Sequence, residues 1–222
     1  DLTLQWKRES VLGASRILAI SENTKNDIVN IYGVDEQKID VVYLSSSLQK
    51  VQTTPNTPLP KKYLLFVGNR GKYKNFKRFL KAVAPLLRKD RDLHVVCAGG
   101  GRFNKEELSN IAQLKIDKPV SFIDINIGTL PYLYQNALLF VFPSLYEGFG
   151  IPVLEAMNCD CPMALSNTSS LPEIGGDAAV YFNPESTEHM STIIKNTIYD
   201  REKMSKLVKS GKERRGDFCW KS

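Results

Sequence analysis

Short apolar runs alternate with longer segments of helical spacing along most of the chain. Eight runs rich in β-branched and aromatic side chains predict strands at 16–21, 39–43, 63–67, 94–98, 120–123, 138–142, 162–165 and 179–182. Most of these runs are apolar on both faces, as strands covered by helices on both sides are. The pattern therefore predicts an α/β protein built on a Rossmann-like, doubly wound parallel sheet.

Helical spacing is clearest after the third run, where apolar side chains recur at steps of three, four and seven: Phe76, Phe79, Leu80, Val83, Leu86 and Leu87. Ser21 is expected to cap a helix that runs to Tyr32 and stops at Gly33, because a serine oxygen accepts from free amides and glycine ends helices readily. Ser186 is expected to open a further helix that carries Met190, Ile193, Ile194 and Ile198.

The apolar period disappears within a segment rich in serine, threonine and proline, and this break suggests the domain organisation. Residues 51–61 are interpreted as a linker. The preceding residues 1–50 are too few for an independent α/β domain and are interpreted as the remnant of a second Rossmann-like domain. Residues 62–205 hold six of the predicted strands and form a complete domain, and 206–222 are expected to be a truncated helical segment. The 222 residues thus look like part of a longer chain.

Composition fits a globular protein, with 42% hydrophobic and 24% charged residues. The formal net charge of +6 favours anionic partners without choosing among phosphates, nucleic acid and lipid headgroups. No apolar run approaches the length of a membrane span, and four scattered cysteines favour a reducing compartment, so a cytoplasmic location is expected. No His, Cys, Asp and Glu cluster has metal-ligand spacing, so no metal is expected.

Ligands of open parallel sheets bind beyond the carboxyl ends of the strands, so the loops there are candidate sites. After the third run, Gly68 and Asn69 precede Arg70 and Lys74 at the start of a helix. Two cations near a helix N-terminus suit a diphosphate, although a solvated basic turn is an equal alternative. The glycines at 99–101 permit either close approach to a ligand or a tight turn.

Two further loops carry candidate chemistry. The end of the fifth run could offer main-chain groups to a flat base, or could simply be core. After the sixth run, glycines flank Phe149, and Pro152 stands at the expected start of a helix. Glu147 in this loop and Glu155 on the helix can each accept paired hydrogen bonds from the vicinal hydroxyls of a sugar. The alternatives are a solvated loop residue for Glu147 and a carboxylate favoured by the helix dipole for Glu155.

These motifs together resemble the C-terminal, donor-binding half of retaining glycosyltransferases of family 4 (group 1), which have the GT-B architecture of two facing Rossmann-like domains. The resemblance rests on the Glu-x7-Glu segment from Glu147 to Glu155, on Gly68 with its basic pair, and on the Pro-Glu and Gly-Asp-Ala-Ala stretch at 171–179. The form of the 68–76 segment is similar to a bacterial branch with many mannosyltransferases. One departure is Leu44 followed by three serines, where family members often have Asn-Gly-Val-Asp.

The resemblance implies transfer of a hexose such as mannose, with retention, from a GDP- or UDP-linked donor to a saccharide or lipid-linked acceptor. It implies catalytic roles for Glu147, Arg70 and Lys74, the two cations holding the diphosphate and Glu147 the transferred sugar. It further implies donor contacts, including the base beside 122–124 and the ribose at Glu155, for Gly68, Asn69, Phe122, Ile123, Asp124, Phe149, Gly150, Ile151, Leu154 and Glu155.

Two other functions stay open from the sequence. The chain could be a non-catalytic nucleotide-sugar binding module. Nucleic-acid binding is suggested by charge alone, and no aromatic-interleaved groove accompanies the basic stretch at 203–215. A solvated helix, or one that touches an anionic membrane at its inner face, is the more favoured interpretation of that stretch.

Overall fold

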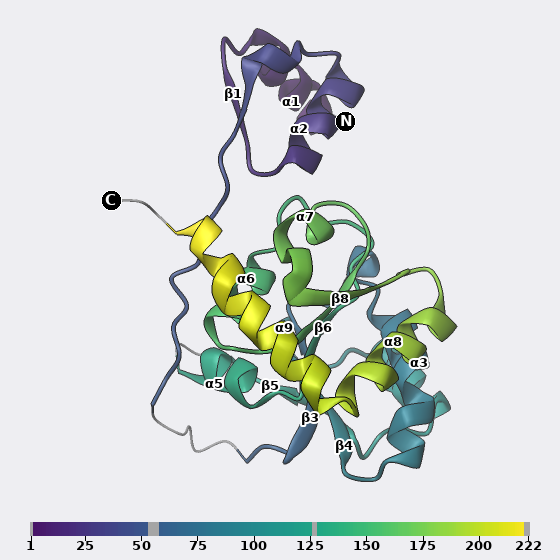
Figure 1. The fold of residues 1–222 in the computed structure, drawn as a ribbon. Coiled ribbons are helices and arrows are strands. Elements are labelled where there is room, and N and C mark those ends of the chain that lie inside the picture. The colour runs from purple at the N-terminus through teal and green to yellow at the C-terminus, as the bar shows by residue number, and fades with distance from the viewer. Residues whose placement is uncertain (1, 53–57, 126–127, 220–222) are drawn as a thin grey trace.

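The computed structural model describes residues 2–52, 58–125 and 128–219, which form a smaller and a larger part (Figure 1). The smaller part, at the top of Figure 1, consists of α1 (Leu2–Gly13), β1 (Ile17–Ala19), α2 (Glu22–Tyr32), a 3-10 turn (Glu36–Lys38) and β2 (Ile39–Val41). The larger part contains β3 (Lys62–Val67), α3 (Phe76–Lys89), β4 (Leu93–Ala98), α4 (Lys105–Gln113), β5 (Val120–Ile123), α5 (Thr129–Asn136), β6 (Leu139–Phe142), α6 (Ile151–Asn158), β7 (Met163–Ser166), α7 (Leu171–Gly175), β8 (Ala179–Phe182), α8 (Thr187–Ile198) and α9 (Arg201–Arg214).

The six strands of the larger part form one parallel sheet in the order β5-β4-β3-β6-β7-β8. The chain first moves outward from β3 to β5 and then returns to place β6 on the other side of β3. Leu65 in β3 therefore pairs with Val96 on one side and Phe140 on the other. This reversal of strand order is a topological switch point, where loops diverge and leave a crevice at the carboxyl edge. The strands β1 and β2 form a separate parallel pair.

The sheet separates two hydrophobic cores. Alternate residues of β3 point to opposite faces, so Leu65 belongs to one core while Leu64 and Phe66 belong to the other. Side chains of α5, α6 and α7 complete the first core, and those of α3, α4 and α8 complete the second. A sheet buried on both faces explains the continuous apolar runs of its strands.

Helix ends follow the expected local chemistry. The Ser21 Oγ accepts a hydrogen bond from the Thr24 amide at the start of α2, and Gly33 ends that helix in the left-handed conformation at φ 69°. The Ser186 Oγ accepts from the His189 amide at the start of α8. These contacts confirm the three predicted helix boundaries.

The predicted fold is confirmed, since each of the eight runs overlaps a strand and the main sheet is parallel and doubly wound. Two details differ. Helix α6 begins at Ile151, so Pro152 is its second residue, where its missing N–H is equally harmless. The division expected between residues 205 and 206 falls inside the continuous helix α9. The rest of the domain division remains a prediction, and residues 53–57 of the expected linker and 220–222 of the last segment lie outside the described residues.

In the described parts of the chain, no helix combines the length and apolar character needed to cross a bilayer.

Candidate functional site

Two loops meet at the switch point between β3 and β6, and hydrogen bonds join them. The Leu145 amide of the β6–α6 loop donates to the Tyr73 carbonyl of the β3–α3 loop at 2.8 Å. Asn75 is buried in the left-handed conformation, and its Nδ2 donates to the carbonyls of Pro143 at 3.0 Å and Pro184 at 2.7 Å. A short amide side chain tolerates this conformation, which allows it to tie the two loops together.

Lys74 and Glu147 form an ion pair across this junction. The Lys74 Nζ lies 2.6 Å from the Glu147 Oε1, and the two side chains are only 12% and 14% exposed. The ammonium group also lies 4.8 Å from the centroid of the Phe142 ring, at the end of β6. The structure thus brings together a cation and a carboxylate that are far apart in the sequence, as the expected crevice requires.

The turn at 147–150 is held by its backbone. The Glu147 amide donates to the Ser169 Oγ at 3.0 Å, and the Ser170 hydroxyl lies 2.9 Å from both the Glu147 and the Phe149 carbonyls. Gly150 has φ 103°, and an added Cβ would lie 2.9 Å from Leu171 Cδ2, so glycine fits this position best. The turn is therefore rigid before any ligand binds.

Glu155 lies on α6, one turn beyond this loop, and is partly buried. The hydroxyl of the buried Tyr134 donates to the Glu155 Oε2 at 2.9 Å. Burial raises the pKa of Glu155 above its ordinary value, and the hydrogen bond from Tyr134 acts in the opposite direction. The carboxylate faces a groove of about 560 Å³ that is also lined by Ile151, Pro131 and residues 45–51.

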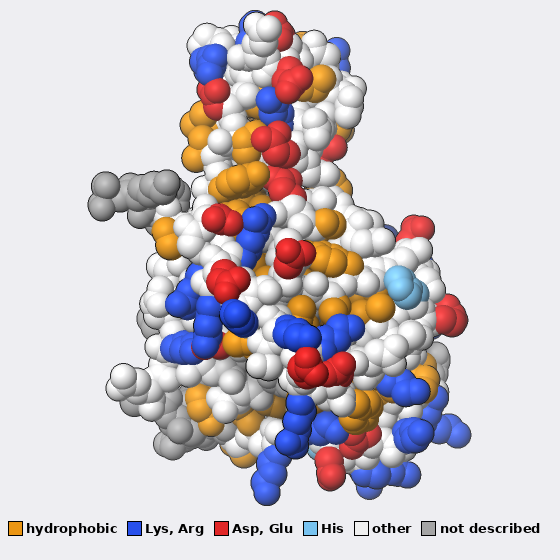
Figure 2. Space-filling model, in the orientation of Figure 1, with side chains coloured by type: hydrophobic (Ala, Val, Ile, Leu, Met, Phe, Trp, Pro, Cys, Tyr) orange, Lys and Arg blue, Asp and Glu red, His pale blue; other side chains and the backbone are white. Residues whose placement is uncertain are grey.

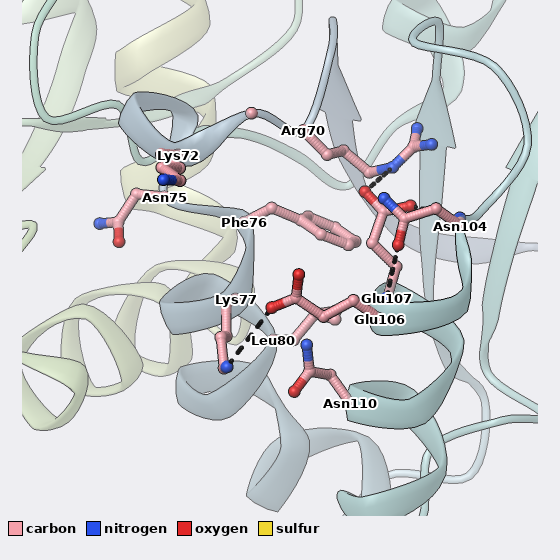
Figure 3. A pocket seen from close by; sticks show the side chains of 11 residues that line it. Arg70, Lys72, Asn75, Phe76, Lys77, Leu80, Asn104, Glu106, Glu107 and Asn110 are labelled. Carbon is pink, nitrogen blue, oxygen red and sulfur yellow. Dashed lines mark hydrogen bonds and ion pairs between the residues drawn. The ribbon is translucent and has the colours of Figure 1, made fainter.

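Arg70 is placed differently from the expectation. Its Nε donates to the Glu107 Oε1 at 2.8 Å, and its other nitrogens donate to the carbonyls of Gly99 at 2.9 Å, Gly101 at 2.7 Å and Arg102 at 3.1 Å. The side chain is only 3% exposed and extends toward the start of α4 (Figure 3). The two expected cations therefore do not converge on the 147–150 turn.

The physical reason is the satisfaction of a buried guanidinium group. Such a group needs acceptors for its five donors and a counter-charge, and the carbonyls of the 99–102 loop with Glu107 supply both. Three phenylalanine rings, those of Phe76, Phe103 and Phe122, surround it at 5.0 to 5.8 Å from their centroids. The adjoining cavity of about 380 Å³ lies between α3 and α4 (Figure 3), and no residue of the 147–150 turn lines it.

The remaining expected donor contacts are spread along the same edge of the sheet. Gly68 directly follows β3 at φ 111°, and Asn69 is exposed beside it. At the end of β5, Phe122 and the exposed Asp124 line a separate groove of about 520 Å³, while Ile123 packs on the first core. Two other expected contacts, Phe149 and Leu154, are buried members of the first core.

The described residues contain no group of three or more His, Cys, Asp or Glu that could hold a metal ion. The expectation of a metal-independent site stays a prediction, as do the individual ligand roles.

Sequence reasoning missed three groups that support the site. Tyr134 touches Glu155, Ser169 and Ser170 hold the turn, and Ser21 with Thr24 reaches it from α2. Each contact joins residues more than twenty positions apart, which a spacing pattern does not reveal. Only the position of Ser169 and Ser170 directly before the Pro-Glu stretch could have drawn attention to them.

Residues 49–214 match the family model of Glycosyl transferases group 1, and the chain belongs to that family.

Known proteins agree with this assignment. The O-antigen chain mannosyltransferase B of Escherichia coli is 27% identical over 96% of this chain and 59% of its own length. Two solved structures share the fold. Sucrose-phosphate synthase of Thermosynechococcus elongatus has a TM-score of 0.83 at 19% identity and matches 98% of this chain and 58% of its own. Anabaena HepE in complex with UDP and glucose has a TM-score of 0.80 at 18% identity and matches 94% and 60%.

The chain thus spans about three-fifths of the length of these relatives. Its fold is of the Rossmann-like GT-B type, and one curated homologue is a mannosyltransferase.

Proposed function

We propose that this chain is the donor-binding part of a retaining hexosyltransferase that uses a nucleotide diphosphate sugar, with mannose the favoured hexose. The observation that carries the proposal is the Lys74–Glu147 pair at the switch point, with Glu155 one helical turn further on. A cation beside the N-terminus of α6 suits a diphosphate, and the two carboxylates suit the hydroxyls of a sugar and a ribose. The mannosyltransferase homologue supports mannose, and the complex of HepE with UDP and glucose supports a nucleotide-linked donor.

In the proposed reaction, the bond between the sugar and the diphosphate breaks through an oxocarbenium-like state, and negative charge grows on the departing oxygen. Lys74 and the N-terminal amides of α6 stabilise that charge, because fixed charges and dipoles in a water-poor crevice need little rearrangement. Glu147 holds the transferred sugar and Glu155 the ribose. Arg70 could join the diphosphate only by exchanging Glu107 and several carbonyls for it, so its first role is to hold the 99–102 loop.

The groups already present supply charge without a metal, and we propose that transfer needs none.

The acceptor is proposed to be a saccharide or a lipid-linked saccharide. Lys206, Lys209 and Lys212 on α9 are exposed, and they support peripheral contact with anionic lipid on the cytoplasmic side. Figure 2 shows lysine and arginine side chains gathered on one face of the larger part.

The proposal is tested by titrating the protein with GDP and UDP in a calorimeter. Wild type is expected to bind one of them, and Glu155→Ala is expected to weaken that binding by about 1 to 3 kcal/mol, because ribose hydroxyls lose their acceptor. Glu188→Ala removes a glutamate from the first turn of α8 and serves as the matched control. Unchanged affinity in Glu155→Ala would remove this residue from the site.

Two alternative functions, nucleic-acid binding and nucleotide-sugar binding without transfer, are tested by two further measurements. A bound nucleotide raises the unfolding temperature, whereas a nucleic-acid-binding protein would be protected by duplex DNA or RNA at moderate salt. A panel of nucleotide sugars against the full-length protein, with linkage analysis of the product, then distinguishes a transferase from a binding module, and it also reports retention or inversion.

A further inference from the structure

Helix α2 of the smaller part contacts the 147–150 turn directly. The Ser21 Oγ donates to the Gly148 carbonyl at 2.7 Å, and the Thr24 Oγ1 donates to the same oxygen at 3.0 Å. An added Cβ on Gly148 would lie 3.6 Å from Ile20 and 3.7 Å from Thr24, so the glycine backbone lies against this helix start. The two hydroxyls therefore fix the orientation of one carbonyl in the proposed sugar-binding turn.

A carboxylate of the larger part also contacts α2. The Glu173 side chain accepts hydrogen bonds from the α2 amides of Glu22 at 2.7 Å and Asn23 at 3.1 Å. These first-turn amides have no acceptor within their own helix, and the helix dipole stabilises a negative charge beside them. Together, Ser21, Thr24 and Glu173 are called the α2 clamp below.

Tyr43, from the segment that follows β2, adds to the same junction. Burial raises the pKa of its hydroxyl to about 12, with a further contribution from Glu173, so the phenol stays protonated and can donate to that carboxylate. Its ring lies 6.3 Å from that of Phe149 and 5.5 Å from that of Phe218.

Glu173 is itself held in place by the last turn of α9. The Arg214 Nη2 donates to the Glu173 carbonyl at 2.6 Å. The junction is therefore a connected set of hydrogen bonds that surrounds the turn, and its members come from both parts of the molecule.

The planar peptide bond links this contact to the proposed chemistry. The trans peptide between Gly148 and Phe149 has its N–H opposite its C=O, so a carbonyl held toward α2 directs the Phe149 amide away from α2. The Ser170 hydroxyl holds the neighbouring carbonyls of Glu147 and Phe149 in the same way. The amides of the turn next to Glu147 therefore have fixed directions, and these amides would bind the transferred sugar.

We infer that Ser21, Thr24 and Glu173 are positioning residues, through which the smaller part orients the sugar-binding amides of the larger part. The inference rests on the proposed function and extends it. The donor turn is therefore held in its orientation while α2 contacts it.

The test uses Thr24→Val, which keeps the shape of the side chain and the Ser21 cap but removes one hydroxyl, with Thr24→Ser as the conservative variant. In the intact protein, Thr24→Val and Glu173→Ala are expected to lower kcat about tenfold, because turn amides that are less well oriented make weaker hydrogen bonds to the sugar in the transition state. The Kd for the free nucleoside diphosphate is expected to change less than about twofold, because that ligand does not reach the turn amides. Thr24→Ser is expected to restore kcat.

Ser186→Ala is the matched control, since it removes a serine N-cap from α8 and leaves the cap of α2 in place. It is expected to lower stability, as the loss of an N-cap does, and to leave kcat unchanged. An unchanged kcat in Thr24→Val, or an equal loss in Ser186→Ala, would overturn the inference.

Hydrogen exchange distinguishes a failure of the proposed function from a failure of the inference on the α2 clamp. If wild type transfers no sugar and binds no nucleotide, the proposed function fails. The clamp is then judged by the Glu147 amide, which donates to the Ser169 Oγ within the same turn and is expected to exchange about tenfold faster in Thr24→Val and Glu173→Ala than in wild type. Equal exchange in all variants would overturn the clamp itself.

Discussion

At the scale of a residue, burial of the Glu155 carboxylate disfavours its ionised form, and the hydrogen bond from Tyr134 partly offsets this effect. Burial raises the pKa of Glu155 in the folded protein above the ordinary value of 4.5. Below pH 4.5 the carboxyl is neutral in both states, and as the pH rises through the folded pKa the unfolded state ionises more easily. The contribution of Glu155 to the unfolding free energy is therefore present at low pH and is lost toward neutral pH.

Tyr134→Phe is expected to increase this loss, because the hydroxyl at 2.9 Å stabilises the ionised form. Urea unfolding should give a deficit of roughly 1.5 to 3 kcal/mol at pH 7, the usual cost of a hydrogen bond to a charged group, and a smaller deficit at pH 4. Tyr63→Phe is the matched control, since its buried hydroxyl donates to the neutral Leu133 carbonyl at 2.7 Å. Equal pH dependence in the two variants would contradict the assignment.

At the scale of elements, the glycines after β4 show how closely two loops can approach. An added Cβ on Gly100 would lie 2.8 Å from both the Asn69 Cα and the Gly68 oxygen, which are backbone atoms that cannot rotate away. Its neighbour Gly101 has a similar φ, 75° against 71°, but nothing within 4 Å of an added Cβ. Gly101 is thus restricted by its backbone conformation alone, whereas Gly100 is restricted by its conformation and by the lack of space for a side chain.

Gly101→Ala is expected to lower the unfolding free energy by about 1 kcal/mol, the cost of a left-handed alanine. Gly100→Ala is expected to cost roughly 1 to 3 kcal/mol more, because the β3 and β4 loops must move apart. Chemical denaturation of the two variants measures the difference. Equal costs would mean that the close approach of the loops is not a constraint in solution.

Local signals at this scale predicted the elements well, and long-range contacts explain what they missed. Periodicity located the strands, and the Ser21, Gly33 and Ser186 signals located helix ends, because each depends on neighbours in the sequence. The partner of Arg70 depends on which loop the fold places beside it. A basic turn before a helix was therefore correctly recognised, while the direction of its guanidinium group was not.

At the scale of the whole molecule, the two parts differ greatly in how much apolar surface they bury. The core of the smaller part consists of Ala19, Val34 and Ile39 with partly buried neighbours, whereas the larger part has an extensive core on each face of its sheet. The smaller part contacts the larger one through hydrogen bonds of α2 and through a few apolar groups, Ile20 and the Tyr43 ring. Polar contacts of this kind contribute less to cooperative unfolding than a shared apolar core does.

The two parts are therefore expected to open separately. Amides of β1 and β2 should exchange at least about a hundredfold faster than those of β3 and β6, because local opening of a small core costs less free energy. Hydrogen exchange under conditions where opening is in rapid equilibrium measures this ratio directly. Removing the α2 clamp with Glu173→Ala should speed exchange in the smaller part while leaving β3 and β6 unchanged. Uniform protection in wild type would instead mean that the junction joins both parts into one cooperative unit, with the donor turn permanently seated against α2.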